Sequence, residues 1–212
     1  MWLVVGLGNP GPEHSASRHN VGFRVLQAVA AAAGVPCRRR RFESLCATAT
    51  LAGVPVTLVL PQAYMNLSGE PVRAWVEHLR LPPERLLVIH DDIDLPLGQL
   101  RVVREGGHAG HKGVRAIQEA LGTSGFPRLR LGVGRPPGKP ETPAFVLGAF
   151  TSEEAEVAEG MIARAADGVL LILAEGLTAA MNRLNVRPPS GTPGAAEGEG
   201  QEERSAGCGA MR

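Results

Sequence analysis

The 212-residue sequence is poor in aromatic side chains, has few cysteines and lacks any long apolar run. Phe, Trp and Tyr make up only 4% of the residues, so Val, Leu, Ile and Ala must fill most of the core. The three cysteines, Cys37, Cys46 and Cys208, have neither metal-ligand spacing nor the pattern of a disulfide framework. This cysteine usage argues against a small secreted domain and favours a reducing cytoplasm.

Membrane insertion and secretion are also disfavoured by what is missing. No stretch approaches the roughly 18 consecutive apolar residues of a membrane-spanning helix. The N-terminus reads Met-Trp-Leu-Val-Val-Gly over residues 1–6, with no basic segment ahead of the apolar residues. That pattern argues against a signal peptide and favours a buried first strand. We therefore expect a cytoplasmic protein without a membrane partner.

What is present is the composition of a globular domain. Hydrophobic residues make up 44% of the chain and charged residues 20%, with a formal net charge of +1 at pH 7. A chain of this length can bury a substantial core in one or at most two domains. So small a net charge does not by itself indicate a nucleic-acid partner.

Short apolar segments alternate along the chain with amphipathic ones. Strands are expected at residues 2–7, 42–51, 55–60, 86–89, 99–103 and 128–133, and helices at 21–33, 69–80, 112–121, 152–174 and 177–185. This alternation predicts an α/β fold with a largely buried sheet. Residues 188–212 contain no Val, Ile, Leu, Phe, Tyr or Trp. They cannot bury enough apolar surface to offset their ordering entropy, which predicts a disordered tail.

The glycine loop at residues 6–11, Gly-Leu-Gly-Asn-Pro-Gly, matches the pattern of a dinucleotide-binding turn. That turn needs a helix whose free N–H groups meet the pyrophosphate, but Pro10 and Pro12 lack backbone N–H groups. It also needs an acidic residue about 20 positions further on, and residues 24–42 contain no Asp or Glu. We therefore reject a nucleotide cofactor and assign the glycines to a tight turn at the end of a strand.

Clusters of mostly polar side chains gather in the loops around these strands and helices. They are Asn9, His14, Arg18, His19 and Asn20; Tyr64, Met65 and Asn66; His90, Asp91, Asp92 and Asp94; and His108, His111 and Lys112. In α/β folds, loops at the strand ends meet in one crevice. Each residue alone has an ordinary explanation: Asn66 as a helix N-cap, His19 as a helix-entry residue, and the three aspartates as turn residues or metal ligands.

Taken together, these side chains indicate hydrolysis. Histidine side chains ordinarily titrate near ~6.5, so a neutral imidazole is suited to removing a proton from water. An aspartate bonded to its other ring nitrogen fixes the tautomer, and asparagine amides stabilise a developing oxyanion. The chain has no Gly-x-Ser-x-Gly turn and no cysteine in a nucleophile motif. The pattern therefore favours direct attack by activated water, without a covalent intermediate.

Several of these segments resemble the bacterial peptidyl-tRNA hydrolase family. They are residues 4–11 (Val-Val-Gly-Leu-Gly-Asn-Pro-Gly), 17–22 (Ser-Arg-His-Asn-Val-Gly), 65–69 (Met-Asn-Leu-Ser-Gly), 90–96 (His-Asp-Asp-Ile-Asp-Leu-Pro), 107–113 (Gly-His-Ala-Gly-His-Lys-Gly), 128–136, 145–147 and 179–185. The resemblance covers about residues 2–186 in order. It implies one catalytic α/β domain, residues 1–187, with a twisted mixed sheet flanked by helices. It also implies a monomer that acts on peptidyl-tRNA without a metal or cofactor.

The resemblance also implies roles for individual residues. His19 is expected to be the general base and Asp91 the carboxylate that orients it. Residues expected to contact the substrate are Asn9, His14, Met65, Asn66, His111 and Lys112. Two of them depart from the family pattern, which usually has Tyr in place of His14 and Asn in place of Lys112. Lysine offers only donors, so it cannot replace the acceptor of an Asn side chain.

Basic residues near the motif loops are the expected contacts to the tRNA backbone. They are Arg101, Arg104, Arg128 and Arg130. The run Arg38-Arg39-Arg40-Arg41 has two interpretations, a solvated loop or a further set of phosphate contacts.

Two other functions stay open at this point. Some plant-organelle relatives with this fold serve in RNA splicing, so a non-catalytic RNA-binding protein is the first alternative, although the presence of Asn9, His19, Asn66 and Asp91 favours the enzyme. The second is a general esterase or peptidase for small substrates. A hydrolysis assay that compares an N-acyl-aminoacyl-tRNA with a small ester of the same acyl amino acid separates these functions.

Overall fold

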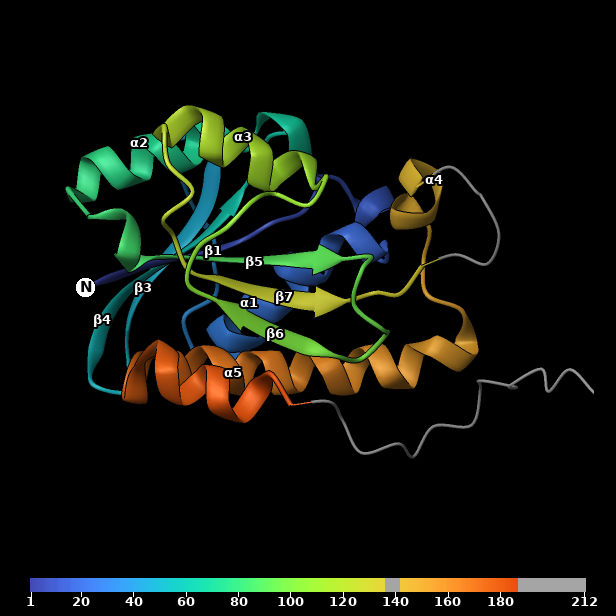
Figure 1. The fold of residues 1–212 in the computed structure, drawn as a ribbon. Helices are drawn as coiled ribbons and strands as arrows, with labels where there is room; N and C mark the ends of the chain where they lie inside the picture. The colour runs from blue at the N-terminus through green and yellow to red at the C-terminus, as the bar shows by residue number, and fades with distance from the viewer. Residues whose placement is uncertain (136–141, 187–212) are drawn as a thin grey trace, which may run out of the picture.

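The computed structural model describes residues 1–135 and 142–186, and its central element is a seven-stranded β-sheet (Figure 1). Its strands are β1 (Trp2–Gly6), β2 (Arg39–Arg41), β3 (Ser44–Leu51), β4 (Val54–Pro61), β5 (Leu86–Asp92), β6 (Leu100–Val103) and β7 (Arg128–Gly132). They lie in the order β2-β3-β4-β1-β5-β7-β6. The neighbours β4, β1, β5 and β7 are parallel, whereas β2, β3 and β6 pair antiparallel. The prediction of a mixed sheet is confirmed.

Helices cover both faces of this sheet. The α-helices are α1 (Val21–Ala32), α2 (Gly69–Leu79), α3 (Lys112–Leu121), α4 (Thr142–Leu147) and α5 (Ser152–Leu184), and the short 3-10 helices are η1 (Pro12–His14), η2 (Arg18–Asn20), η3 (Met65–Leu67) and η4 (Pro83–Arg85). In Figure 1, α2 and α3 lie above the sheet, and α1 and α5 lie below it. Two apolar cores result, one on each face. No helix of the described residues is long and apolar enough to cross a membrane.

The central strands form where the sequence offers short, continuous apolar runs. All residues of β1 and of β5 are buried, because helices cover both faces of these strands. Along β1, Leu3 and Val5 enter the core below α2 and α3, whereas Val4 enters the core beside α1 and α5. This alternation is the period of two that a strand imposes on its side chains.

Two glycines, Gly6 at the end of β1 and Gly22 in α1, permit a close approach of backbone to backbone. A Cβ atom on Gly6 would lie 2.3 Å from the carbonyl oxygen of Gly22, and one on Gly22 would lie 2.4 Å from the carbonyl oxygen of Ile89. Side chains at these positions would push α1 away from the sheet. Gly6 and Gly22 therefore allow α1 to lie directly against β1 and β5.

Two segments differ from the sequence expectation. The arginine run, for which one interpretation was a solvated loop, forms the edge strand β2, because residues 42 and 43 make a tight turn that pairs it with β3. Helix α4 begins at residue 142, inside a stretch expected to be loop up to residue 144. The predicted division between two C-terminal helices is confirmed: within α5, the φ of 85° and ψ of 173° at Gly176 interrupt the helical geometry. The expected disordered tail at 188–212 lies outside the described residues.

Candidate active site

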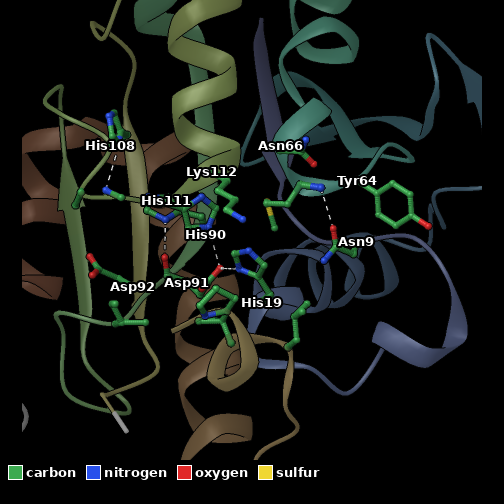
Figure 2. Close-up of a pocket in the computed structure, with 17 residues that line it drawn as sticks. Asn9, His19, Tyr64, Asn66, His90, Asp91, Asp92, His108, His111 and Lys112 are labelled. Atoms are coloured by element: carbon green, nitrogen blue, oxygen red, sulfur yellow. Dashed lines mark hydrogen bonds and ion pairs between the residues drawn. The ribbon is translucent and has the colours of Figure 1, made fainter. Parts of the chain in front are cut away.

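The parallel strands β1, β4 and β5 end at the same edge of the sheet, and the segments that follow them, together with residues 108–112 and helix α4, enclose a cavity of about 520 Å³ (Figure 2). This volume is typical of a small-molecule or cofactor site. Its polar lining includes Asn9, His19, Asn66, Asp91, His111 and Lys112. The loops that the sequence expectation assigned to one crevice do meet there.

His19 and Asp91 form a hydrogen-bonded pair at the centre of this cavity. His19 belongs to η2, Asp91 is near the end of β5, and His19 Nδ1 lies 2.8 Å from Asp91 Oδ1. Both residues are buried, at 8% and 2% exposure. Since the carboxylate can only accept, Nδ1 of a neutral His19 carries the proton. Its Nε2 therefore keeps a lone pair, and His19 lines the cavity (Figure 2).

His111 is a second imidazole on the same carboxylate oxygen. Its Nε2 lies 2.9 Å from Asp91 Oδ1, and its Nδ1 accepts from the backbone N–H of Val114 at 3.2 Å. The second bond makes His111 the N-cap of α3. Because Nδ1 is an acceptor, the proton of a neutral His111 must be on Nε2, from which it is donated to Asp91.

These two donors keep Asp91 ionised. Burial alone would raise the pKa of its carboxyl group, but the charges and hydrogen bonds of His111 and His19 outweigh burial and hold this pKa well below its ordinary value. Asp91 is therefore a fixed negative charge that orients both rings. An aspartate in this state can stabilise a positive charge that develops on either imidazole.

The same three side chains have the composition of a metal site. One ligand atom each from His19, Asp91 and His111 lie within 4.8 Å of one another. A metal on His111 Nε2 would require a proton on Nδ1, where it would face the N–H of Val114 instead of accepting from it. The hydrogen bonds therefore fit a protein network better than a metal centre. The neighbouring carboxylates of Asp92 and Asp94 are paired separately, with Arg130 and Arg135.

Asn9 is held so that its amide nitrogen remains available. Its Oδ1 accepts from the backbone N–H of Met65 at 2.8 Å. Two bonds with the side chain of Asn20, each 2.9 Å long, fix its backbone N–H and carbonyl. Since Oδ1 is occupied, Nδ2 is the group that Asn9 can offer to a ligand in the cavity (Figure 2).

Arg18, next to His19, anchors the apolar wall of the cavity. Its buried guanidinium donates to the carbonyl of Ala149 and to Glu154 and lies 4.3 Å from the ring centroid of Phe145. These contacts attach α4 to η2, so Val146 and Leu147 line the cavity opposite the polar groups. The sequence motif Ser-Arg-His-Asn contained this arginine, but nothing local indicated that it would contact a segment about 130 residues away.

His90 was also grouped with the loop residues, and the structure buries it beside His111 at the wall of the cavity, with 3% of its surface exposed. Its Nδ1 donates to the carbonyl of Asp91 at 2.7 Å, its ring centroid lies 4.7 Å from that of His111, and its Nε2 has no partner among the described residues. Burial, together with the nearby charges of His111 and Arg128, lowers the pKa of His90 well below its ordinary value against the opposing effect of Asp91. His90 is therefore neutral in the folded protein.

This burial of His90 predicts acid destabilisation. Below pH ~6.5 the unfolded chain binds a proton at this position and the folded protein does not, so stability must fall as pH falls. Between pH 8 and pH 5 the contribution lost is about 2 kcal/mol if His90 stays neutral throughout. Denaturant unfolding should show that loss in the wild type and a correspondingly flatter pH dependence in His90→Asn. The difference in unfolding free energy between the two proteins at pH 8 measures the packing effect alone. An equal dependence of unfolding free energy on pH in both proteins would refute the assignment.

Two of the predicted contact residues, His14 and Arg128, lie away from the positions expected for them. The structure places His14 outside the cavity: it ends η1, half-buried, with Nε2 3.9 Å from Glu13. Arg128 is only 3% exposed, and its guanidinium donates to the carbonyls of Gly106 and Gly107, so it holds the glycine loop and is not available to phosphates.

The other arginines predicted to bind tRNA differ in how available they are. Arg130 pairs with Asp92, and Arg104 donates to the hydroxyl of Thr178. Arg101 on β6 is exposed. Whether an arginine is free to bind a phosphate depends on partners from distant parts of the chain. Its position near a motif loop therefore does not predict whether it is free.

Comparison with known proteins agrees with the geometry. The sequence profile of the family described as peptidyl-tRNA hydrolase matches residues 3–191. A protein of Chloroflexus aggregans named peptidyl-tRNA hydrolase is 50% identical over 187 residues, covering 87% of this chain and 99% of that protein. The chloroplastic peptidyl-tRNA hydrolase of Arabidopsis thaliana is 42% identical, with 88% of this chain and 65% of that protein covered. The crystal structure of peptidyl-tRNA hydrolase from Acinetobacter baumannii matches with a TM-score of 0.82 at 35% identity, covering 87% of this chain and 94% of that one.

Proposed function

Since the chain belongs to the peptidyl-tRNA hydrolase family, we propose that it hydrolyses the ester bond between a peptide and its tRNA, with His19 as the general base. The observation that carries this assignment is the buried His19–Asp91 pair, in which Nδ1 and Oδ1 lie 2.8 Å apart. Asn9 and Asn66 line the same cavity. Release of the tRNA would recycle it from aborted translation.

The reaction follows from the tautomer of His19. Its Nε2 takes a proton from water while the water oxygen bonds to the ester carbon. The bond from that carbon to the ribose oxygen then breaks, and the imidazolium returns the proton to the leaving oxygen. Asp91, an acceptor for both His19 and His111, stabilises the positive imidazole during this step.

Two asparagines would place the ester. The Nδ2 group of Asn9 can donate to the carbonyl of the substrate because its Oδ1 is occupied by Met65. Asn66, exposed at the cavity wall, offers a second amide. Donors aimed at the oxygen that becomes negative stabilise the tetrahedral intermediate more than the substrate. The apolar wall of Met65, Val146 and Leu147 suits the side chains of a peptide.

A turnover assay tests the function directly. The wild type should release peptide from N-acyl-aminoacyl-tRNA and should be far slower on a small ester of the same acyl amino acid. Equal rates on both would indicate a general esterase. Binding of the tRNA without any hydrolysis would indicate the non-catalytic RNA-binding alternative.

Lys112 contributes a positive charge to this cavity. It is the first residue of α3, is exposed, and its side chain points into the cavity (Figure 2). A positive charge at a helix N-terminus opposes the helix dipole, so its placement suggests a compensating role toward an anionic substrate. We propose that it attracts a phosphate near the 3′ end of the tRNA.

Lys112→Asn is therefore expected to weaken tRNA binding and to reduce the slope of log affinity against log salt by about one contact, roughly 0.7 to 0.9. Turnover at saturation should be kept or slightly raised. Binding measured at two salt concentrations for both proteins checks this. An unchanged slope would mean that the lysine only points into solvent.

We also propose that the enzyme acts as a monomer in the cytoplasm. The proposed groups all come from one chain, so the cavity needs no contribution from a second copy. Peptidyl-tRNA arises at the ribosome, and the cysteine usage of the sequence fits the reducing cytoplasm in which ribosomes work. The tail at 188–212 is proposed to be dispensable for this chemistry.

A further inference from the structure

The arginines expected to bind tRNA are largely engaged within the protein, which leaves the question of what attracts this polyanion. Arg128 holds a loop, Arg130 pairs with Asp92, and Arg104 donates to Thr178. Nucleic-acid affinity depends strongly on cations that neutralise phosphates. Arg101 and Lys112 are exposed, and a further basic surface near the cavity would add to the attraction that these two residues exert.

The run Arg38–Arg41 is such a surface. All four residues are exposed, and Arg39–Arg41 form β2, the edge strand of the sheet. The ion pairs of the described residues involve other arginines. Within the described part of the chain, these four positive charges are thus not neutralised by ion pairs.

The pairing of β2 with β3 divides the run between the two faces of the sheet. Arg39 pairs with Cys46 and Arg41 with Ser44, and Cys46 belongs to the core below α2 and α3. The charges of Arg39 and Arg41 both act on the thiol of Cys46, lowering its pKa against the larger raising effect of burial. Arg40 pairs with Leu45, which packs against the core on the opposite face. Arg39 and Arg41 therefore lie on the face of α2, and Arg40 lies on the other.

The Arg41 end of β2 lies at the edge of the sheet that carries the cavity. Ser44, its partner, pairs with Pro61 at the end of β4, and the next residue, Gln62, donates to the carbonyl of Glu43 at 2.7 Å. Tyr64 and Met65, which line the cavity, follow directly. Two strand spacings, about 10 Å, separate β2 from β4.

Arg41 is held in place by aromatic rings. Its guanidinium carbon lies 4.7 Å from the ring centroid of Phe42 and 5.8 Å from that of Trp75 in α2, and its Nη2 lies 3.4 Å from Nδ1 of His78. A stacked guanidinium loses little conformational freedom on binding a phosphate, because its orientation is already restricted.

We propose that Arg39 and Arg41 bind the sugar-phosphate backbone of the tRNA's helical acceptor arm while its 3′ end lies in the cavity. This inference rests on the proposed function. The two side chains are two residues apart on one strand, roughly 7 Å, and therefore project side by side toward neighbouring phosphates. The contacts are to backbone only, so they favour no particular tRNA sequence.

The competing explanation is that charge on an edge strand prevents edge-to-edge association of sheets. That role needs no tRNA, and it would use Arg40 as readily as Arg39. The two explanations predict different behaviour for neighbouring residues of the same strand.

The test uses the full chain and a fluorescently labelled RNA hairpin that carries an acceptor stem and a 3′ CCA end. Arg39→Gln should weaken binding and lower the salt slope by roughly 0.7 to 0.9, and Arg39→Gln/Arg41→Gln by about twice that, with an affinity loss of about tenfold. Arg40→Gln, with the same change of charge one residue away, should change the slope much less. Thermal unfolding of each variant checks that the strand is intact, and Arg39→Gln alone spares the Arg41 stacking.

Turnover separates this inference from the proposed function. The double variant should raise KM for peptidyl-tRNA about tenfold, keep kcat, and leave hydrolysis of a peptidyl-CCA trinucleotide unchanged. Equal losses for Arg39→Gln and Arg40→Gln, or unchanged affinity in all variants, would overturn the inference. So would aggregation of the variants with an unchanged KM, which would support edge protection. Failure of the wild type to hydrolyse peptidyl-tRNA would refute the proposed function instead.

Discussion

His19→Ala should lower kcat for peptidyl-tRNA hydrolysis by roughly 10²–10⁴-fold, the usual contribution of a general base. Nε2 of His19 is the proposed acceptor of the water proton, because Nδ1 is bonded to Asp91. Binding of tRNA and KM should change little, since the base acts on water and not on the tRNA. Single-turnover rates and tRNA affinity, measured on the same preparation, check both parts.

His14→Ala is the matched control for that experiment. It removes an imidazole from the same loop, but His14 lies outside the cavity, so turnover should stay close to wild type. If His19→Ala retained near wild-type kcat, the general base would have to be another group. A large loss in His14→Ala would show that the loop, and not the His19 imidazole, determines the rate.

Asp91→Asn is expected to have the second largest effect, a loss in kcat of about 10²–10⁴-fold. Asp91 Oδ1 accepts hydrogen bonds from His19 Nδ1 at 2.8 Å and from His111 Nε2 at 2.9 Å. Since both rings use Oδ1, an asparagine oxygen could still accept from both, but the amide carries no negative charge and cannot stabilise the imidazolium that forms on His19. If the amide turns its nitrogen toward the rings instead, His19 must carry its proton on Nε2, where it can no longer accept from water.

The measurement must separate a lost orientation from a lost fold. kcat should fall far more than KM rises, and thermal unfolding should show how much structure the substitution costs. Asp94→Asn removes a neighbouring carboxylate that is paired with Arg135 and does not line the cavity, so it should leave kcat nearly unchanged. Retained turnover in Asp91→Asn would contradict the orienting role of this carboxylate.

The histidine cluster explains why these two residues have such large expected effects. His111 is held by the N-cap bond to Val114 and donates to Asp91, and His90 packs against His111 from behind. The position of Asp91 is thus determined from two sides before a substrate binds. Preorganisation of this kind lowers the cost of reaching the transition state.

Much of the fold was accessible from sequence, and so was the meeting of the loops that carry His19 and Asp91. Leu86–Ile89 is a continuous apolar run followed by His-Asp-Asp, which predicts a buried strand with polar groups at its end. The motif Ser-Arg-His-Asn precedes the apolar face of α1. Loops at the ends of parallel strands meet in one crevice, so the segments that carry His19 and Asp91 were expected together although 72 residues separate the two. The pairing itself was implied by the family resemblance.

What the sequence by itself determined was the period of its apolar residues, and with it the strands, the helices and the loops that carry polar groups. Only the tertiary structure decided which polar groups are free. Arg128 and Arg39 look alike in sequence, yet one is buried under the glycine loop and the other is exposed on an edge strand. The tautomer of His111 was decided in the same way, by the N–H of Val114. The physical reason is range: strand and helix patterns repeat within a few residues, whereas burial, ion pairing and protonation depend on groups that folding brings from distant parts of the chain.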